Sequence, residues 1–465
     1  MDYFETQSIV YQAPPMPRRH RLGLVAASAL AVLVASCQSP EPEQDWGDVS
    51  AAADRAAVDA PGFLYGRVTT TSGAVYQGRL RWGGGEEAFW NDTFNGVKHE
   101  NPWAAQTPLG AEAERPARLF GIEVPWGKPA LDLGRPFMAR FGDIARIESR
   151  GDGVQGVVER GAEYDPTVRV TLKSGAVADL DRLSSSDFDD GVRVWDGRRG
   201  VVDLGPREIR SVEFVPTPPL RAVPRRLYGT VRTPGGAFTG FLQWDRELAT
   251  DDDELVGPTA EGGARVRLGA VRAIRHQLDG GLRVALRDGR EVQLAAGVGG
   301  RGVYVHDDRY GRVLVSPRAM QRVEFARPDA GASGPGYGDF APGAPLAGRV
   351  TTRDGRTVTG RIVYDLDEAE TTETLDAPAA GVDYSVPFGW VASVTLPART
   401  DRPARVVLRS GETLALDRAG DLGDGNAGVL VFPAGGASSE YVPWSAVAQV
   451  DLDDPAPGDV KRAPE

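Results

Sequence analysis

Alternating apolar and polar positions recur along the chain and predict short β-strands with one buried face. The clearest runs read apolar, Arg, Val, any residue, Leu, and end in a Ser-Gly or Asp-Gly turn. They occupy residues 168–175, 282–289 and 404–411. A turn of this composition accepts a positive φ, and an alternating run follows each one and ends at Leu180, Leu294 and Leu416. Each run therefore predicts a β-hairpin.

A second pattern precedes each of these hairpins. Its copies begin at Leu64, Leu227 and Leu346, and each includes a second alternating run with an internal glycine, at Gly78, Gly240 and Gly360. A glycine inside a strand favours a sharp bend or a bulge. The copies close with similar phrases at residues 141–147, 268–274 and 388–394, in which apolar residues lie three apart. That spacing predicts one 3₁₀ turn leading into a last strand.

The order of strand, turn, bent strand, further strands, 3₁₀ turn and last strand resembles that of SH3-like and Sm-like small β-barrels. The resemblance is architectural, because neither family's ligand motif is present, and it therefore implies a fold but no ligand. The expected fold class is all-β, with three tandem repeats that are each a pair of small SH3-like or Sm-like β-barrels.

The patterns also predict domain boundaries. The repeats are expected at residues 62–214, 227–325 and 346–452. Segments rich in proline, or in glycine, proline and alanine, predict linkers at residues 215–226 and 326–345, and residues 453–465 are expected to form a disordered tail.

The N-terminus has the order of a secretion signal. A short basic segment at residues 16–21 precedes an apolar run at residues 22–35, which is too short for a bilayer span, and residues 34–37 read Val-Ala-Ser-Cys. This last phrase resembles the lipobox of bacterial lipoproteins. The resemblance implies cleavage after residue 36, lipidation of Cys37, and an exported protein anchored to a membrane. Gln38 after the cysteine implies the outer membrane of a Gram-negative bacterium, with residues 37–61 as a tether. Met16 is an alternative translation start.

Composition narrows the function classes. The chain of 465 residues has a net charge of −12, which disfavours nucleic acid as a partner. Cys37 is its one cysteine, so no internal disulfide and no cysteine-based metal site are expected. No catalytic motif, metal-binding spacing or cofactor motif is found, and His99, His276 and His306 lie far apart in the sequence. We expect no catalytic residues, no metal and no cofactor.

The first repeat carries an insertion at about residues 89–129 that the other copies lack. It concentrates Trp90, Phe94, Trp103 and Trp126 among polar residues. Such aromatic residues either cap the core of a terminal repeat or form a partner-binding face, and the sequence leaves both alternatives open. The sequence favours a non-enzymatic envelope module that binds a protein or a glycan. The alternative is a carboxylate- or metal-dependent envelope hydrolase.

Overall fold

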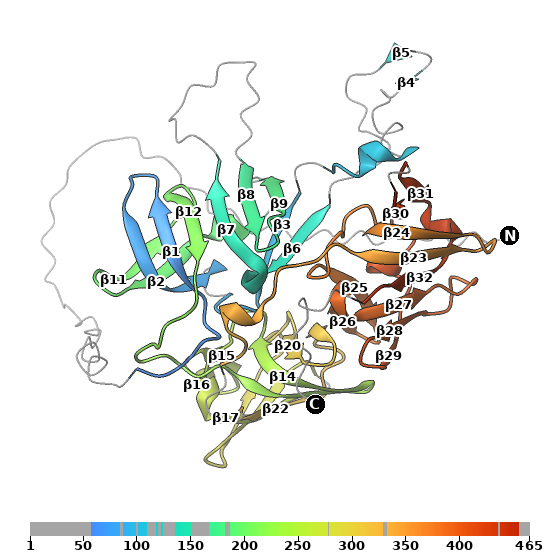
Figure 1. The fold of residues 1–465 in the computed structure, drawn as a ribbon. Coiled ribbons are helices and arrows are strands. Elements are labelled where there is room, and N and C mark those ends of the chain that lie inside the picture. The colour runs from blue at the N-terminus through green and yellow to red at the C-terminus, as the bar shows by residue number, and fades with distance from the viewer. Residues whose placement is uncertain are drawn as a thin grey trace, which may run out of the picture. The chain divides into compact units, whose positions relative to one another are not determined.

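The computed structural model describes residues 57–83, 87–98, 101–108, 118–119, 122–123, 135–150, 167–181, 187–277, 279–328, 333–435 and 438–454. The chain divides into Met1–Ala51 and Ala52–Glu465, and all described residues belong to the second part. The described residues form β-strands and short 3₁₀ turns, so the protein is all-β, as the sequence predicts (Figure 1). No helix of this described part is long and apolar enough to cross a membrane.

The first sheet has eight strands in the order β11-β10-β2-β1-β12-β7-β8-β9. Their bounds are β1 (Tyr65–Thr70), β2 (Val75–Trp82), β7 (Ile144–Ser149), β8 (Thr167–Leu172), β9 (Val177–Asp181), β10 (Val192–Asp196), β11 (Gly200–Leu204) and β12 (Ile209–Phe214).

The second sheet has ten strands in the order β19-β18-β17-β22-β13-β14-β20-β21-β26-β25. Eight of them are β13 (Tyr228–Thr233), β14 (Gly236–Trp244), β17 (Val271–His276), β18 (Leu282–Leu286), β19 (Glu291–Leu294), β20 (Val303–Asp307), β21 (Gly311–Val315) and β22 (Arg322–Ala326). The outer two, β25 (Thr374–Ala379) and β26 (Val382–Pro387), come from a later part of the chain.

The third sheet has eight strands in the order β29-β28-β27-β32-β23-β24-β30-β31. They are β23 (Ala347–Thr352), β24 (Thr357–Tyr364), β27 (Val391–Thr395), β28 (Ala404–Leu408), β29 (Thr413–Leu416), β30 (Val429–Phe432), β31 (Glu440–Val442) and β32 (Val447–Leu452). Apart from β25 and β26, the second sheet therefore has the same strand order as the first and the third.

The predicted hairpins and 3₁₀ turns are confirmed. The Ser-Gly and Asp-Gly turns join β8 to β9, β18 to β19 and β28 to β29. The closing phrases form the 3₁₀ turns η3 (Phe141–Asp143), η5 (Leu268–Ala270) and η7 (Phe388–Trp390), each followed by a strand. The other described 3₁₀ turns are η2 (Ala104–Gln106), η4 (Asp187–Asp190), η6 (Tyr337–Asp339), η8 (Gly420–Leu422) and η9 (Trp444–Ala446).

The expected pairs of separate barrels are not formed. β12 follows the β8–β9 hairpin in the chain and pairs with both β1 and β7, so it joins the strands of both predicted patterns in one sheet. β22 and β32 take the equivalent positions. Among the described strands the two ends of each large sheet do not pair with each other, so the pairing closes no barrel.

A further hairpin lies between the second strand and the 3₁₀ turn in each of the patterns that begin at Leu64, Leu227 and Leu346. It consists of β3 (Thr93–Val97) and β6 (Pro136–Arg140) in the first, β15 (Glu254–Thr259) and β16 (Gly262–Arg267) in the second, and β25 and β26 in the third. β26 also pairs with β21, which joins the third hairpin to the second sheet (Figure 1). The insertion extends the β3–β6 hairpin and includes η2 and the two-residue strands β4 (Arg118–Leu119) and β5 (Ile122–Glu123).

The segments expected as linkers are packed against the first sheet. Thr217 donates a hydrogen bond to the carbonyl of Phe63 at 2.6 Å. In the second linker, the Tyr337 ring packs against Trp90 in a tilted arrangement with ring centroids 4.6 Å apart, and Phe340 is buried in the core of the first sheet. Each large sheet has its own cluster of buried apolar residues.

Candidate functional site

Trp90 and Phe94 lie in the core of the first sheet. Both side chains are fully buried. The Trp90 indole N–H donates to Thr217 Oγ1 at 3.1 Å, and the Phe94 ring contacts Trp82 and Phe141 at centroid distances of 5.6 and 5.7 Å. Of the two alternatives for the insertion, burial favours core packing for these two residues, because a partner in solution has no access to them.

Trp103 lies elsewhere, half-buried against the third sheet. Its ring centroid is 6.0 Å from that of Phe432 in an edge-on arrangement, and the Arg361 guanidinium lies 5.3 Å from the ring. Trp103 also lines a hollow of about 480 Å³ together with Lys98 and Asp179. Trp126 and Cys37 lie outside the described residues.

Polar contacts fix this part of the insertion on the loop that follows β24. Lys98 Nζ lies 2.5 Å from Asp367 Oδ1 and 3.4 Å from Glu373 Oε1. The Arg135 guanidinium lies 3.1 Å from Asp365 Oδ1. The insertion is therefore an internal strap between the first hairpin and the third sheet, a role that the sequence pattern does not indicate.

The contact of Lys98 with Glu373 belongs to a set of three. An acidic residue before each hairpin accepts hydrogen bonds from the backbone N–H groups three and four residues earlier, and these acids are Asp92, Asp253 and Glu373. Each acid also contacts a cation from another part of the chain: Arg226 at 3.6 Å, Arg81 at 3.2 Å and Lys98 at 3.4 Å, respectively. Each of these three equivalent loops thus carries an electrostatic contact with a distant part of the chain.

The first of these contacts contains a buried histidine. His306 Nε2 lies 3.3 Å from Asp92 Oδ1. Burial lowers the pKa of His306 to about 4, and the nearby Arg226 also disfavours the imidazolium. Burial likewise lowers the pKa of Arg226 to about 10. At neutral pH the cluster consists of a neutral imidazole, a carboxylate and a guanidinium.

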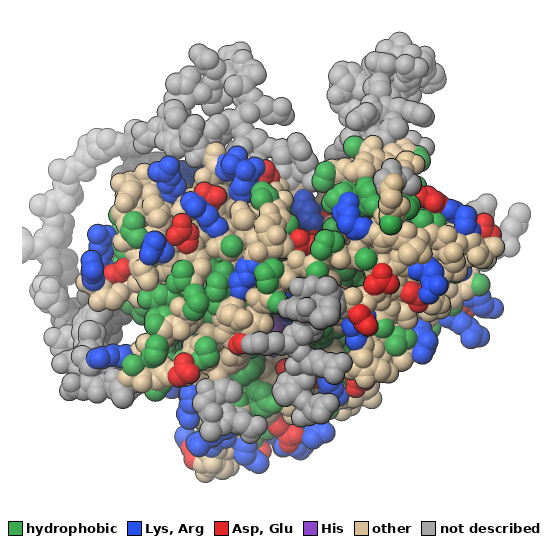
Figure 2. All heavy atoms as spheres, in the orientation of Figure 1, with side chains coloured by type: hydrophobic (Ala, Val, Ile, Leu, Met, Phe, Trp, Pro, Cys, Tyr) green, Lys and Arg blue, Asp and Glu red, His purple; other side chains and the backbone are tan. Residues whose placement is uncertain are grey.

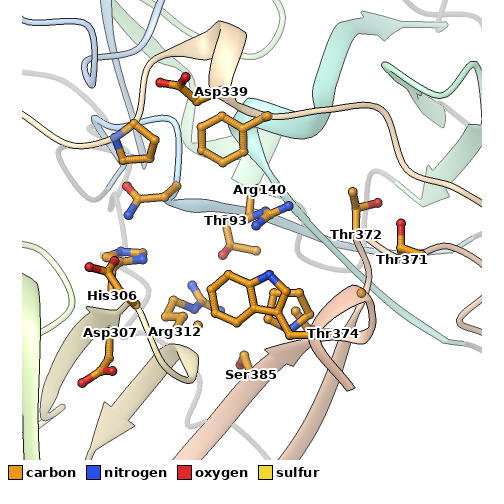
Figure 3. A pocket seen from close by; sticks show the side chains of 18 of the residues that line it. Thr93, Arg140, His306, Asp307, Arg312, Asp339, Thr371, Thr372, Thr374 and Ser385 are labelled. Atoms are coloured by element: carbon orange, nitrogen blue, oxygen red, sulfur yellow. The ribbon is translucent and has the colours of Figure 1, made fainter. Parts of the chain in front are cut away.

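A cavity of about 290 Å³ begins beside His306, and we call it the three-sheet cavity (Figure 3). Several parts of the chain form its walls. The β3–β6 hairpin supplies Thr93 and Arg140, and the strands β20 and β21 supply His306 and Arg312. Thr374, Ser385 and Trp390 come from β25, β26 and η7. The segment 335–341 supplies Asp339 and Phe340. Its volume is near the lower end of the roughly 300–1,000 Å³ typical of small-molecule sites.

The two arginines of the three-sheet cavity differ in their partners. Arg140 makes a two-point contact with Asp143, with Nε 2.6 Å from Oδ2 and Nη2 3.1 Å from Oδ1. Arg312 stacks over the Tyr304 ring at 4.6 Å. Among the described residues, no hydrogen bond or ion pair engages the Arg312 guanidinium. Arg312 is therefore the cation of this cavity that is available to a ligand.

Several carboxylates near η8 have raised pKa values. Burial raises the pKa of Glu368 and of Asp421 well above their usual ranges, and neighbouring carboxylates act in the same direction. Burial also raises the pKa of Asp365 to about 6, against the opposing effect of Arg135. No group of three or more His, Cys, Asp or Glu within the described ranges is arranged to hold a metal ion.

Comparisons with family models, curated proteins and solved structures found no match to this chain. Sequence reasoning missed the three-sheet cavity, because its residues are scattered between Asn91 and Trp390 and belong to no motif. The cross-strand neighbours His306 and Arg312 were the available signal, since both stand in strand segments whose other face is apolar.

Proposed function

We propose that this protein is an exported lipoprotein, anchored to a membrane by lipid on Cys37, and that its β-rich part is a non-enzymatic binding module for a protein or glycan partner in the cell envelope. The proposed location is the outer membrane of a Gram-negative bacterium. The three-sheet cavity carries the binding proposal, because an available guanidinium, hydroxyl groups and aromatic rings converge there. Such a mixture suits recognition of a polar ligand.

We also propose that the β-rich part consists of three tandem copies of one structural unit. The recurring strand order supports this, and so does a recurring hydrogen bond: the first N–H of η3, η5 and η7 donates to the carbonyl of Asp92, Asp253 and Glu373, respectively. Two of the three equivalent hairpins, β3–β6 and β25–β26, line the cavity. Trp103, beside its hollow, remains a candidate contact for a protein partner, and Trp126 remains a candidate from the sequence.

Nucleic acid is not a proposed partner. Figure 2 shows basic and acidic side chains interspersed over the described surface in view, without a broad basic patch. A protein that binds a phosphate backbone concentrates its positive charge. The net charge of −12 points the same way.

The raised pKa values of Glu368 and Asp421 favour a second candidate, a carboxylate-dependent envelope hydrolase. A protonated carboxyl group is a possible general acid. Asp421, however, accepts a hydrogen bond from the Asp376 backbone N–H at 2.6 Å, and Tyr364 donates one to the Asp421 carbonyl. These contacts are structural, and we rank this candidate second.

Two measurements test the proposal. Metabolic labelling with a fatty-acid probe should mark the wild-type chain and not Cys37→Ala, and equal labelling of both would contradict the anchor. Crosslinking of the mature, detergent-purified protein in envelope extracts should capture a protein or glycan without turnover. Turnover of an envelope substrate that Glu368→Gln or Asp421→Asn abolishes would instead support the hydrolase.

A further inference from the structure

We propose that the three-sheet cavity binds an acidic sugar residue, with Arg312 binding its carboxylate and Trp390 packing against its ring. This inference rests on the proposed binding function and names the ligand class of the same site.

Arg312 supplies the anion contact. It is the cross-strand neighbour of His306 on β20 and of Ser385 on β26, so strands on both sides fix its backbone. Stacking over Tyr304 restricts its side chain further. A planar guanidinium binds a carboxylate through two parallel hydrogen bonds. Arg312 is thus held in place with its hydrogen-bond donors available.

The charges around Arg312 favour a ligand with one negative charge over a ligand with several. His306 is neutral at pH 7, so it adds no positive charge. Asp307 lies at the same wall, but Arg309 contacts its carboxylate at 2.8 Å. Asp308 and Asp339 also line the cavity, and Arg312 acts electrostatically on the buried carboxyl group of Asp376. A phosphate with two charges would meet these carboxylates, whereas a sugar carboxylate needs only the single guanidinium.

The other walls of the cavity offer groups that match the ring and the hydroxyl groups of a sugar. Trp390 is half-buried and presents an indole, whose face suits the apolar side of a pyranose ring. Asn91, Thr93 and Thr372 bring amide and hydroxyl groups that match sugar hydroxyls. Figure 3 shows Thr93 on one side of the cavity and Thr372 on another. A volume of about 290 Å³ suits one or two sugar residues.

The test is a calorimetric titration of the full mature chain in detergent with D-glucuronate, up to about 10 mM. We expect saturable binding to wild type and at least about tenfold weaker binding to Arg312→Gln, the loss typical for a charged hydrogen bond. Arg349→Gln is the matched control, because Arg349 is exposed and contacts Asp451 on the third sheet at 3.6 Å. It should bind glucuronate as wild type does.

Trp390→Phe keeps an aromatic ring and separates ring packing from charge. It should bind glucuronate more strongly than Trp390→Ala, and all variants should show the melting temperature of wild type within a few degrees. D-Glucose and inorganic phosphate are the comparison ligands. Equal binding of glucose or phosphate, no binding of glucuronate, or unchanged binding by Arg312→Gln would each overturn the inference. If envelope crosslinking still captures a partner in those cases, the proposed binding function stands while this ligand class fails.

Discussion

Lys98 and Asp367 form a close ion pair, with Nζ 2.5 Å from Oδ1, although 269 residues separate them in the chain. Both side chains are largely buried, with exposed fractions of 19% and 6%. The pair joins the insertion of the first hairpin to the third sheet. Its replacement therefore tests whether the insertion stabilises the fold.

Lys98→Met should lower the free energy of unfolding by about 2–3 kcal/mol, because it leaves buried Asp367 without its cation. Urea denaturation measures the loss. Arg290→Met removes an exposed pair with Asp288 and should cost about 0–1 kcal/mol. Equal effects of the two changes would show that the insertion is not a strap.

The tryptophans of the insertion should differ in their effect on stability. Trp90→Ala removes a fully buried ring and should cost about 3–5 kcal/mol. Trp103→Ala removes a half-buried ring at Phe432 and should cost about 1–2 kcal/mol. Thermal and urea unfolding of both variants measures the difference. A larger loss for Trp103→Ala would contradict the described packing.

His306 should make stability depend on pH between about 4 and 6.5. Its pKa is lowered from 6.5 to about 4 by burial, so in this range the unfolded chain binds the proton and the folded chain does not. Stability therefore falls as the pH falls through this window, by about 3 kcal/mol in total. Carboxyl groups with raised pKa values, such as Glu368, act with the opposite sign.

The contribution of His306 is isolated by comparison with His306→Leu. The difference in unfolding free energy between the two proteins should shrink toward acid pH, as the wild type loses stability that the variant keeps. Urea unfolding at a series of pH values from 4 to 7.5 measures it. Parallel curves for the two proteins would show that the histidine does not titrate as described.

Gly240 should tolerate no side chain. A Cβ there would lie 1.9 Å from the His306 carbonyl oxygen on β20, which is closer than atoms approach. Gly240→Ala should therefore cost more than about 3 kcal/mol or prevent folding. Gly263→Ala is the control on β16, because nothing lies within 4 Å of the added atom. Circular dichroism and thermal unfolding distinguish the two, and a stable Gly240→Ala protein would contradict the strand spacing.

Local patterns predicted local structure well. Alternation at residues 168–172 and the following Ser-Gly turn identified a real hairpin, and the phrase at residues 141–147 a real 3₁₀ turn. The glycine at 240 was expected to mark a bend or bulge. The strand register is continuous there, and the glycine instead permits the close approach of β20.

The sequence did not predict which strands pair when they lie far apart in the chain. Alternation shows which side chains face a core but not which strands are neighbours, so the return of β12 between β1 and β7 was missed and two barrels were expected in its place. The three-sheet cavity was missed for the same reason. Its walls depend on the pairing of β26 with β21, and a change of pairing would separate Arg312 from Ser385.

The contacts among the three sheets determine how the protein unfolds. Arg81 contacts Asp253, β21 pairs with β26, and Lys98 contacts Asp367, so each sheet or its hairpin touches both of the others. In a linear repeat array each unit touches only its neighbours, and folding can spread from one unit to the next. Here the loss of any one sheet would break its contacts with both of the others. The three sheets should therefore melt in one cooperative transition.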